Sequence, residues 1–411
     1  MKYTTIVSVG SLAAVALAKW DGVAPPAPTS FATQVIQAID QPQVTQAPAA
    51  EDKENFLQGK VYANGYYSSE VMSLAIPSLA NQALAPQASK VAKEPSFFWM
   101  DKMDKVPMIK EFVADAKKKG GDQVIPLVVY DLPDRDCSAL ASNGELSNAN
   151  GGAAKYREYI AAIKKELQAA APIRFVLVIE PDSLANLVTN MDKQKCAGAA
   201  ANYRSLTVMA LKELNLPNVR MYLDAGHGGW LGWDANLGKA AKLFADIYKQ
   251  AGSPKSVRGL ATNVANYNSW DASCASYTKG NEQCNEKRYI EKLGPELAKK
   301  GFPAHFIMDT SRNGVQPTKQ IEWGNWCNVI GTGFGKRPTA NTGNEMLDAF
   351  VWIKPGGECD GTSNTSAARY DGKCGSPDAL KPAPEAGSWF QAYFEQLLTN
   401  AEAGAWPASG S

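Results

Sequence analysis

The chain has 411 residues, of which 42 are lysine or arginine and 41 are aspartate or glutamate, so its formal charge is only +1. Without a basic block, this balance excludes the electrostatic footprint of a protein that binds nucleic acid or anionic membranes. Apolar residues make up 45% of the chain, which is ample for a large core in one or two domains. We therefore expect a soluble globular protein, monomeric by default, that acts on a neutral partner.

The first eighteen residues have the pattern of a secretory signal peptide. A lysine near the start is followed by an apolar run over residues 6–17, which ends in the small-residue pattern Ala-Leu-Ala at residues 16–18. A membrane anchor is the alternative, but the run is shorter than the roughly 20 residues that span a bilayer. We expect the mature chain to begin near Lys19 and to be secreted.

Residues 19–58 predict a tail or linker. They are rich in Pro, Ala, Gln and Thr and too poor in large apolar residues to build a core. No cysteine occurs before Cys137, and nothing of domain size precedes the tail. We predict one globular domain over residues 59–411.

From about residue 59, short β-branched or apolar runs alternate with longer helical patterns such as residues 153–169. This alternation is typical of βα units around a parallel sheet and indicates an α/β fold. The runs expected to be strands are residues 96–100, 124–130, 173–179, 219–223, 257–262, 304–308 and 346–353.

Nearly every one of these runs ends in an acid, an amide or a lysine, as in VVYDLPDRD, LVIEPDS and VWIKPGGE. In a βα barrel the active site lies at the carboxyl ends of the strands, so these side chains are expected to share one cleft. Helix N-caps account for two or three such acids and amides, but not for the Trp, Tyr and His residues among them.

Two strand ends are dominated by carboxylates. One run leads into Glu180 and Asp182, and another into Asp131, Asp134 and Asp136. Hydrolysis of a glycosidic bond needs a protonated carboxyl group for the leaving oxygen and an acceptor that activates water. If Asp136 lies near Asp182, repulsion between like charges raises the pKa of one of them and keeps a proton available.

Other hydrolytic and nucleotide chemistries lack their motifs here. The two histidines, His227 and His305, are in neither HExxH nor another paired metal-ligand spacing, which argues against a zinc hydrolase. No serine lies in G-x-S-x-G, and no GxGxxG follows the early strands. The glycine-rich residues 331–337 lack the P-loop spacing and are interpreted as a structural turn. No metal or cofactor is expected.

The segment LDAGHGGWLGW places His227 close to Trp230 and Trp233 in a glycine-rich stretch. On its own, His227 could equally be a turn residue whose hydrogen bonds are satisfied. Exposed aromatic rings pack against the apolar face of a sugar while polar neighbours bind its hydroxyls, so this segment predicts a sugar-binding surface. Trp99, Trp326 and Trp352 are single cases, and a lone tryptophan is more often part of a core.

Six separated motifs resemble, in order, the fungal cellobiohydrolases of glycoside hydrolase family 6 over residues 62–399. They are YDLPDRDC, VIEPDSLANLVTN, NLPNVRMYLDAGHGGWLGW, GLATNVANYN, WCNVIGTGFG and VWIKPGGECDGTS. The resemblance implies a distorted TIM-like βα barrel of about seven parallel strands, with loops that roof the cleft into a tunnel. It implies inverting hydrolysis of cellulose and cello-oligosaccharides at β-1,4 bonds, mainly to cellobiose from the non-reducing end, without a cofactor.

The resemblance also implies roles for individual residues. Asp182 matches the proton donor, Asp136 the acid that assists it, and Asp360 the candidate catalytic base. Asp224 matches a supporting carboxylate, Tyr130 the residue that favours a distorted sugar, and Ser142 a loop serine that helps to position water. The implied substrate-binding set is Trp99, Asp101, His227, Trp230, Trp233, Asn266, Arg312, Trp326, Lys354 and Glu358.

Seven cysteines in an exported chain favour disulfides and leave at least one thiol unpaired. The spacing of Cys274 and Cys284 suits one short loop, whereas the other pairings are open on spacing alone. The resemblance implies the pairs Cys137 with Cys196 and Cys327 with Cys374, and a free Cys359.

The chain departs from the family in three places. No cellulose-binding module precedes the tail. In IMDTSRNG, other residues stand where the family usually has glutamine-glycine before Arg312. The loop SCASYTKGNEQC is unusual for the family. Both roofing segments, residues 134–152 and 354–375, have full length, which favours a chain-end enzyme over the alternative, an endoglucanase with a more open cleft. A non-catalytic glucan-binding barrel is the second alternative, but Asp182 is intact. The chain's single N-x-[ST] sequon, at Asn364, lies in a roofing segment.

Overall fold

The computed structural model of the chain describes residues 55–402. The expected signal peptide (residues 1–18) and most of the expected tail (residues 19–54) lie outside the described residues. The folded part begins before the predicted start at residue 59, because Phe56 and Leu57 are buried and belong to a 3-10 helix, η1 (Phe56–Gln58). Asn55 caps η1 through the N–H of Leu57 and donates to the carbonyl of Asp348 on the last strand.

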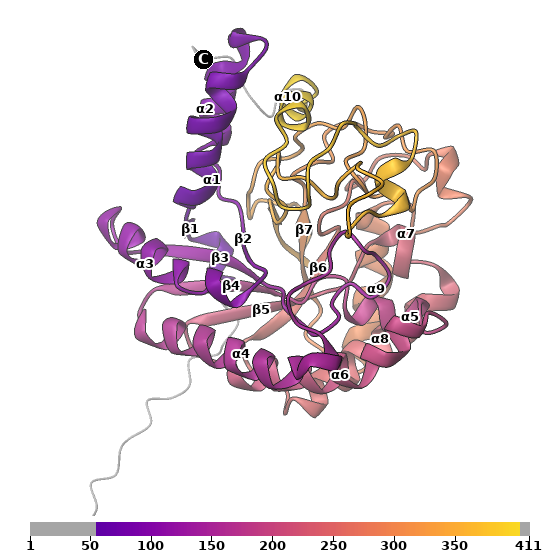
Figure 1. Cartoon of the computed structure of the whole chain (residues 1–411). Coiled ribbons are helices and arrows are strands. Elements are labelled where there is room, and N and C mark those ends of the chain that lie inside the picture. The colour runs from indigo at the N-terminus through magenta and orange to yellow at the C-terminus, as the bar shows by residue number, and fades with distance from the viewer. Residues whose placement is uncertain (1–54, 403–411) are drawn as a thin grey trace, which may run out of the picture. The chain divides into compact units, whose positions relative to one another are not determined.

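The strands form one parallel sheet in the order β1-β3-β4-β5-β6-β7-β8, and β2 also pairs with β3 (Figure 1). β1 and β2 occupy opposite ends of one edge of β3, with Lys60 beside Gln123 and Phe98 beside Leu127. The sheet therefore has seven strand positions, as predicted. The strands are β1 (Lys60–Val61), β2 (Phe98–Met100), β3 (Gln123–Val129), β4 (Arg174–Ile179), β5 (Val219–Asp224), β6 (Val257–Thr262), β7 (His305–Asp309) and β8 (Leu347–Val351).

The barrel is distorted where its first and last strands meet. A single parallel bridge joins Ser96 to Trp352, and the N–H of Phe97 donates to the carbonyl of Trp352 at 2.9 Å. Just beyond it, the indole N–H of Trp99 donates to the carbonyl of Ile353 at 2.8 Å. These few bonds replace the continuous ladder that links neighbouring strands elsewhere in the sheet.

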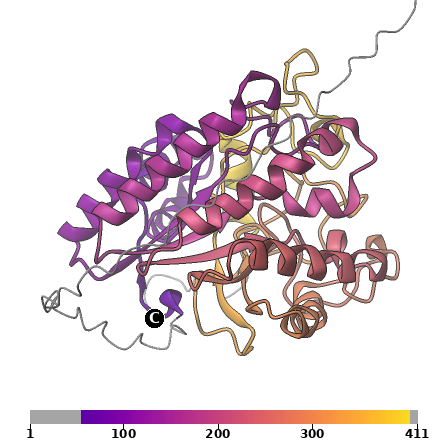
Figure 2. The ribbon, with the colours of Figure 1, turned by 90° about the horizontal axis from the view of Figure 1, so that it is seen from below.

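Helices cover the outside of the sheet, where α4, α6 and α8 pack against one another in chain order (Figures 1 and 2). The helix expected over residues 153–169 is present as α4. No helix within residues 55–402 is long and apolar enough to cross a membrane. The helices are α1 (Gly65–Ser69), α2 (Ala85–Val91), α3 (Met108–Lys118), α4 (Gly152–Ala169), α5 (Leu184–Thr189), α6 (Gln194–Glu213), α7 (Gly228–Leu231), α8 (Asp234–Gln250), α9 (Glu286–Lys299) and α10 (Gln391–Thr399).

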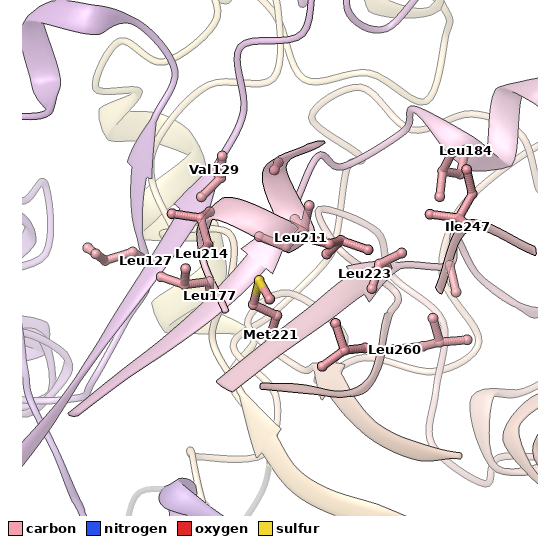
Figure 3. Packing of buried hydrophobic residues seen from close by; sticks show 14 of the residues in the cluster. Leu127, Val129, Leu177, Leu184, Leu211, Leu214, Met221, Leu223, Ile247 and Leu260 are labelled. Atoms are coloured by element: carbon pink, nitrogen blue, oxygen red, sulfur yellow. The ribbon is translucent and has the colours of Figure 1, made fainter. Parts of the chain in front are cut away.

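The period of two along each strand divides the core into two layers. Strand leucines such as Leu127, Leu177 and Leu223 belong to the cluster that includes the helix residues Leu211 and Ile247 (Figure 3). The alternate strand residues form a separate cluster, made chiefly of Val124, Val128, Val176, Val178, Tyr222, Ala261, Ile307 and Ala349. Because both faces are buried, the strands read as continuous apolar runs, and polar residues begin where each strand ends.

Candidate active site

Three carboxylates gather at the carboxyl ends of β3, β4 and β5. Asp136 and Asp182 follow β3 and β4, and both have left-handed backbone, with φ of 44° and 59°. Left-handed backbone is uncommon for residues other than glycine and is concentrated at turns and functional sites. The backbone N–H of Asp182 donates to Oδ2 of Asp224, the last residue of β5, at 3.0 Å. This bond fixes the turn that carries Asp182 onto the neighbouring strand.

Burial raises the pKa of all three carboxyl groups. Burial, followed by the charges of Asp136 and Asp224, raises the pKa of Asp182 well above its usual range. Burial raises the pKa of Asp136 to about 6 and that of Asp224 to about 7. A protonated Asp182 beside an ionised Asp136 is the state that an acid catalyst needs.

Glu180 has a different surrounding from Asp182, although both follow β4. Its carboxylate accepts the N–H groups of Asp131 and Leu132, each at 3.2 Å, and the hydroxyl of Tyr156 at 2.8 Å. Glu180 is fully buried and holds the chain where it leaves β3. Asp131 is also buried, 3.6 Å from a guanidinium nitrogen of Arg135, and burial raises its pKa to about 9. Glu180 therefore supports the turn, and both acids are buried.

Tyr130 and Ser142 lie close to Asp136. Burial raises the pKa of both Asp136 and Tyr130, and hydrogen bonds with the Ser142 side chain oppose part of that rise. The Tyr130 ring meets Trp99 edge to face, with 5.2 Å between the ring centroids. The Arg135 guanidinium lies over the Tyr130 ring, 4.3 Å from its centroid. The structure therefore brings together four of the residues expected here: Asp136, Tyr130, Ser142 and Trp99.

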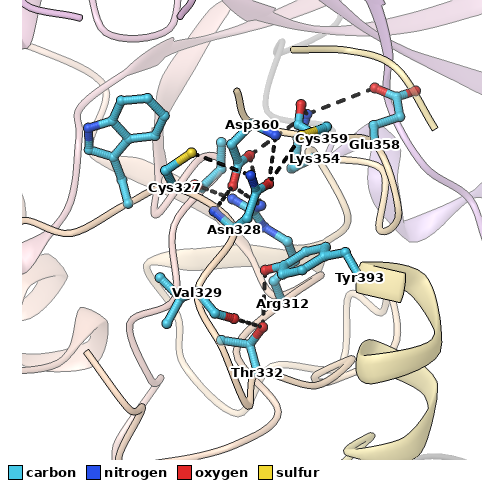
Figure 4. A network of polar contacts seen from close by, with 12 residues as sticks. Arg312, Cys327, Asn328, Val329, Thr332, Lys354, Glu358, Cys359, Asp360 and Tyr393 are labelled. Carbon is cyan, nitrogen blue, oxygen red and sulfur yellow. Dashed lines mark hydrogen bonds and ion pairs between the residues drawn. The ribbon is translucent and has the colours of Figure 1, made fainter. Parts of the chain in front are cut away.

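Asp360 follows β8 and belongs to a second cluster of polar residues, in which both of its carboxylate oxygens already accept hydrogen bonds (Figure 4). One nitrogen of Arg312 donates to both oxygens at 2.8 and 2.7 Å, and the N–H of Asn328 and the hydroxyl of Tyr267 donate to Oδ2 at 2.8 and 3.0 Å. Lys354 lies 3.9 Å away. Within residues 55–402, Asp360 makes no hydrogen bond with Asp182 or Asp136. To accept a proton, Asp360 must give up part of this network.

Arg312 is implied by the resemblance to bind substrate, but its side chain has no exposed surface, so it supports Asp360 instead. Arg312 pairs with Asp360 and also donates to the carbonyl of Ala265. Lys354, after β8, lies between Asp360 and Glu358, with its ammonium 4.0 Å from the Glu358 carboxylate. Asp309, the acid at the end of β7, accepts the N–H groups of Ala265, Ser311, Ile353 and Lys354. Asp309 thus ties β6, β7 and β8 together beneath this group.

The aromatic residues of the site form a continuous series. His227 lies 6.3 Å from Trp230 and 6.4 Å from Trp323, and Trp323 lies 6.3 Å from Trp233, all between ring centroids. The indole N–H groups of Trp230 and Trp233 donate to Thr189 and to the carbonyl of Gly229. Both rings are therefore anchored by their polar edges, and both side chains are only partly buried.

His227 is the N-cap of α7, since its Nδ1 accepts the N–H of Gly229 at 3.2 Å. Burial lowers its pKa to about 4, so the ring is neutral near pH 5 and above and serves as a neutral polar group. The remaining expected binding residues occupy the same rim. Asp101 pairs with Lys105 at 2.7 Å, Asn266 accepts the N–H of Tyr267, and Trp326 is half-buried next to Cys327. Trp352, by contrast, is fully buried and stacks on Phe334, which makes it a core residue.

The two roofing segments touch. The N–H of Leu140, from the segment after β3, donates to Oδ2 of Asp371, from the segment after β8, at 3.0 Å. Near this bond Gly361 packs so closely that an added Cβ would lie 2.8 Å from the Cβ of Ala141 and 2.7 Å from the sulfur of Cys374. The contact joins the two roofing segments.

A model of the family described as glycosyl hydrolases family 6 matches residues 56–401. The chain belongs to this family. It is 63% identical, over 83% of its length and 77% of the relative's, to the probable 1,4-beta-D-glucan cellobiohydrolase C of Neosartorya fischeri. It is 59% identical to exoglucanase 2 of Hypocrea jecorina, over 88% and 77% of the two chains. The catalytic core domain of the cellobiohydrolase Cel6A from Chaetomium thermophilum superposes with a TM-score of 0.82 at 61% identity, covering 85% of this chain and 98% of that one.

The family 6 barrel of this chain contains the three expected disulfides, Cys137–Cys196, Cys274–Cys284 and Cys327–Cys374. Cys359 is a buried free thiol, as the resemblance implies. The first and third disulfides each fix a roofing segment. No group of three or more His, Cys, Asp or Glu side chains within residues 55–402 is arranged to hold a metal ion.

Sequence reasoning missed Trp323, which joins the two halves of the aromatic series. Its indole N–H donates to Asn268 at 2.6 Å, and the same asparagine contacts His227 and Glu286. The second tryptophan of the WGNW motif, Trp326, was singled out because it matches the family's motif. Two tryptophans three residues apart in a polar loop were the available signal for Trp323 as well.

Proposed function

We propose that this chain is an inverting cellobiohydrolase that cleaves β-1,4 bonds of cellulose and cello-oligosaccharides, mainly releasing cellobiose from the non-reducing end. The observation that carries the proposal is the placement of Asp182, Asp136 and Asp224 at adjacent strand ends, beside two roofing segments that touch. Family membership supports the substrate class, because the relatives compared are named cellobiohydrolases or exoglucanases. A related enzyme from Humicola insolens was solved in complex with glucose and cellotetraose, at 57% identity.

In the proposed reaction, Asp182 donates its proton to the glycosidic oxygen as the bond to the anomeric carbon breaks. A water molecule attacks that carbon from the opposite face, which inverts its configuration and yields an α-anomer. The proton that leaves the water goes to a base. Asp136 is ionised when the bond begins to break, which keeps the proton on Asp182 before the reaction and stabilises the positive charge that develops on the sugar.

Ser142 and Tyr130 are proposed to act beside this step, where Ser142 orients the water and Tyr130 packs against the distorted sugar. The base is proposed to be Asp360, acting after its pairing with Arg312 loosens, or Asp136, acting through a water held by Ser142. Trp99, Trp230, Trp233 and Trp326 supply stacking surfaces. The hydroxyl contacts are proposed for Asp101, His227, Asn266, Lys354 and Glu358, whereas Arg312, whose side chain has no exposed surface, is proposed to hold Asp360.

Secretion is part of the proposal. The apolar run at residues 6–17 has the pattern of a signal peptide, and three disulfides are typical of proteins that fold outside the cytosol. The chain is proposed to act as a monomer.

The product pattern separates the chain-end enzyme from an endoglucanase with a more open cleft. With reduced cellohexaose and with carboxymethylcellulose as parallel substrates, we expect cellobiose as the main early product and little loss of viscosity. The contact between Leu140 and Asp371 is the reason, because roofing segments that are joined hinder the entry of a chain interior more than that of a chain end. Mixed early products with a rapid fall in viscosity would instead identify an endoglucanase.

A further inference from the structure

The first turn of α6 is joined to the roofing segment after β3 by three links. Lys193 donates from its ammonium to the hydroxyl of Ser138, and Cys196 forms the disulfide with Cys137. The third link is Lys195, which lies between these two residues in sequence. The joined part of the segment, residues 135–143, carries both Asp136 and Ser142, so α6 holds two residues of the proposed reaction.

Lys195 contacts both ends of residues 135–143. Its ammonium donates to Oδ1 of Asn143 at 2.5 Å and to the carbonyl of Arg135 at 3.3 Å. Arg135 immediately precedes Asp136, and Asn143 immediately follows Ser142. One half-buried ammonium group thus fixes the span between the two residues.

Arg135 completes the frame from within the segment. Its side chain donates to the carbonyls of Ser142 at 2.9 Å, Tyr130 at 2.5 Å and Asp101 at 2.6 Å. Gly144 packs so closely on it that an added Cβ would lie 2.8 Å from Nε of Arg135. Arg135 thus holds Ser142 and Lys195 holds Asn143, and both contacts favour the arrangement in which Asp136 and Ser142 meet.

Lys195 also supplies positive charge to Asp136. Burial raises the pKa of Asp136, the charge of Asp371 raises it further, and the cations Lys195 and Arg135 lower it. The other titratable groups that interact with Asp136 come from neighbouring elements: Asp182, Asp224, Tyr130 and Tyr203. Of the two cations, only Lys195 comes from outside the roofing segment.

We propose that Lys195 is a positioning residue for the hydrolysis, which fixes Asp136 and Ser142 relative to each other and favours the ionised form of Asp136. This role rests on the proposed function. Lys195 acts by holding residues 135–143 in place and by its positive charge near Asp136, without contact with the sugar. A displacement of about 1 Å in such a frame can lower a rate on the order of 100-fold.

The test compares Lys195→Met, Lys195→Gln and Lys195→Arg with Lys193→Met in the full-length protein. We expect Lys195→Met to lower kcat on cellohexaose about 10-fold or more, with little change in KM, and to move the acid limb of the kcat profile to higher pH. The direction follows because loss of the cation raises the pKa of Asp136, which then takes up a proton earlier as the pH falls. Lys195→Arg should restore the acid limb in part.

Lys193→Met is the matched control, since it removes the neighbouring link to Ser138 and should leave the acid limb in place. Lys195→Gln keeps a donor for Asn143 without the charge, so it should shift the acid limb even if Lys195→Met does not fold. An acid limb and kcat equal to wild type in the Lys195→Gln and Lys195→Met variants would overturn this role alone. Absence of turnover by the wild-type enzyme would overturn the proposed function and this role together.

Discussion

Replacing Asp182 with Asn should lower kcat on cellohexaose by about 10²–10⁴-fold, the usual contribution of a positioned acid catalyst. An amide is nearly the same size as the carboxyl group but cannot give a proton to the glycosidic oxygen. The backbone N–H of Asp182, which bonds to Asp224, is unaffected by the change, so the turn should persist. The measurement is steady-state kinetics together with a thermal unfolding midpoint, which should stay near that of the wild type.

The leaving group makes this prediction specific. Fluoride needs little protonation to depart, so Asp182→Asn should lose much less activity on a cellobiosyl fluoride than on cellohexaose. Asp192→Asn, the same change at an exposed position after α5, is the control and should leave both activities near wild type. Substantial turnover of cellohexaose by the Asp182→Asn variant would remove this residue from the role of acid.

Replacing Arg312 with Met should lower the free energy of unfolding by about 3–5 kcal/mol, because breaking a buried ion pair leaves an uncompensated charge. The Arg312 side chain has no exposed surface, and that of Asp360 is only 6% exposed. Denaturant titration measures the effect. The double variant with Asp360→Asn should recover part of the loss, since the amide can be buried without its cationic partner.

Arg369→Met provides the matched comparison. Arg369 pairs with Glu385 at 3.0 Å, and these side chains are 35% and 43% exposed. Screening by water limits such a pair to about 0–1 kcal/mol. If Arg312→Met costs no more than Arg369→Met, Asp360 does not depend on Arg312, and its carboxylate is freer to act as the base than the hydrogen bonds indicate.

The strands could be predicted from the sequence because each is buried on both sides and therefore appears as an apolar run. All seven predicted strands are present, with ends that differ by up to two residues. β1 has no such pattern, since Lys60 and Val61 are a strand only through pairing with β3. The predicted start at residue 59 was late for a related reason: Phe56 and Leu57 are two apolar residues whose burial depends on distant strands.

The site could be predicted only in part. Chemistry and position singled out the acids after β3 and β4, but they could not separate Asp182 from Glu180. That difference lies in the hydrogen bonds from Asp131, Leu132 and Tyr156 that occupy Glu180. The resemblance pointed to Asp360, yet its pairing with Arg312 joins residues 48 positions apart.

Lys195 shows the same limit more sharply. It is one of many lysines in helical patterns, where the usual expectation is a solvated side chain. Its position matters because the adjacent disulfide brings the start of α6 against residues 135–143. Contacts of this kind depend on the fold as a whole, so a pattern within a single segment does not reveal them.

The most direct test of inverting hydrolysis follows cellohexaose by time-resolved proton NMR, reading the anomer of each fresh product before mutarotation. We predict that the new reducing ends appear first as the α-anomer, with cellobiose as the main product. An initial β-anomer would contradict the account, because it would require a covalent intermediate instead of direct attack by water with Asp182 as the acid.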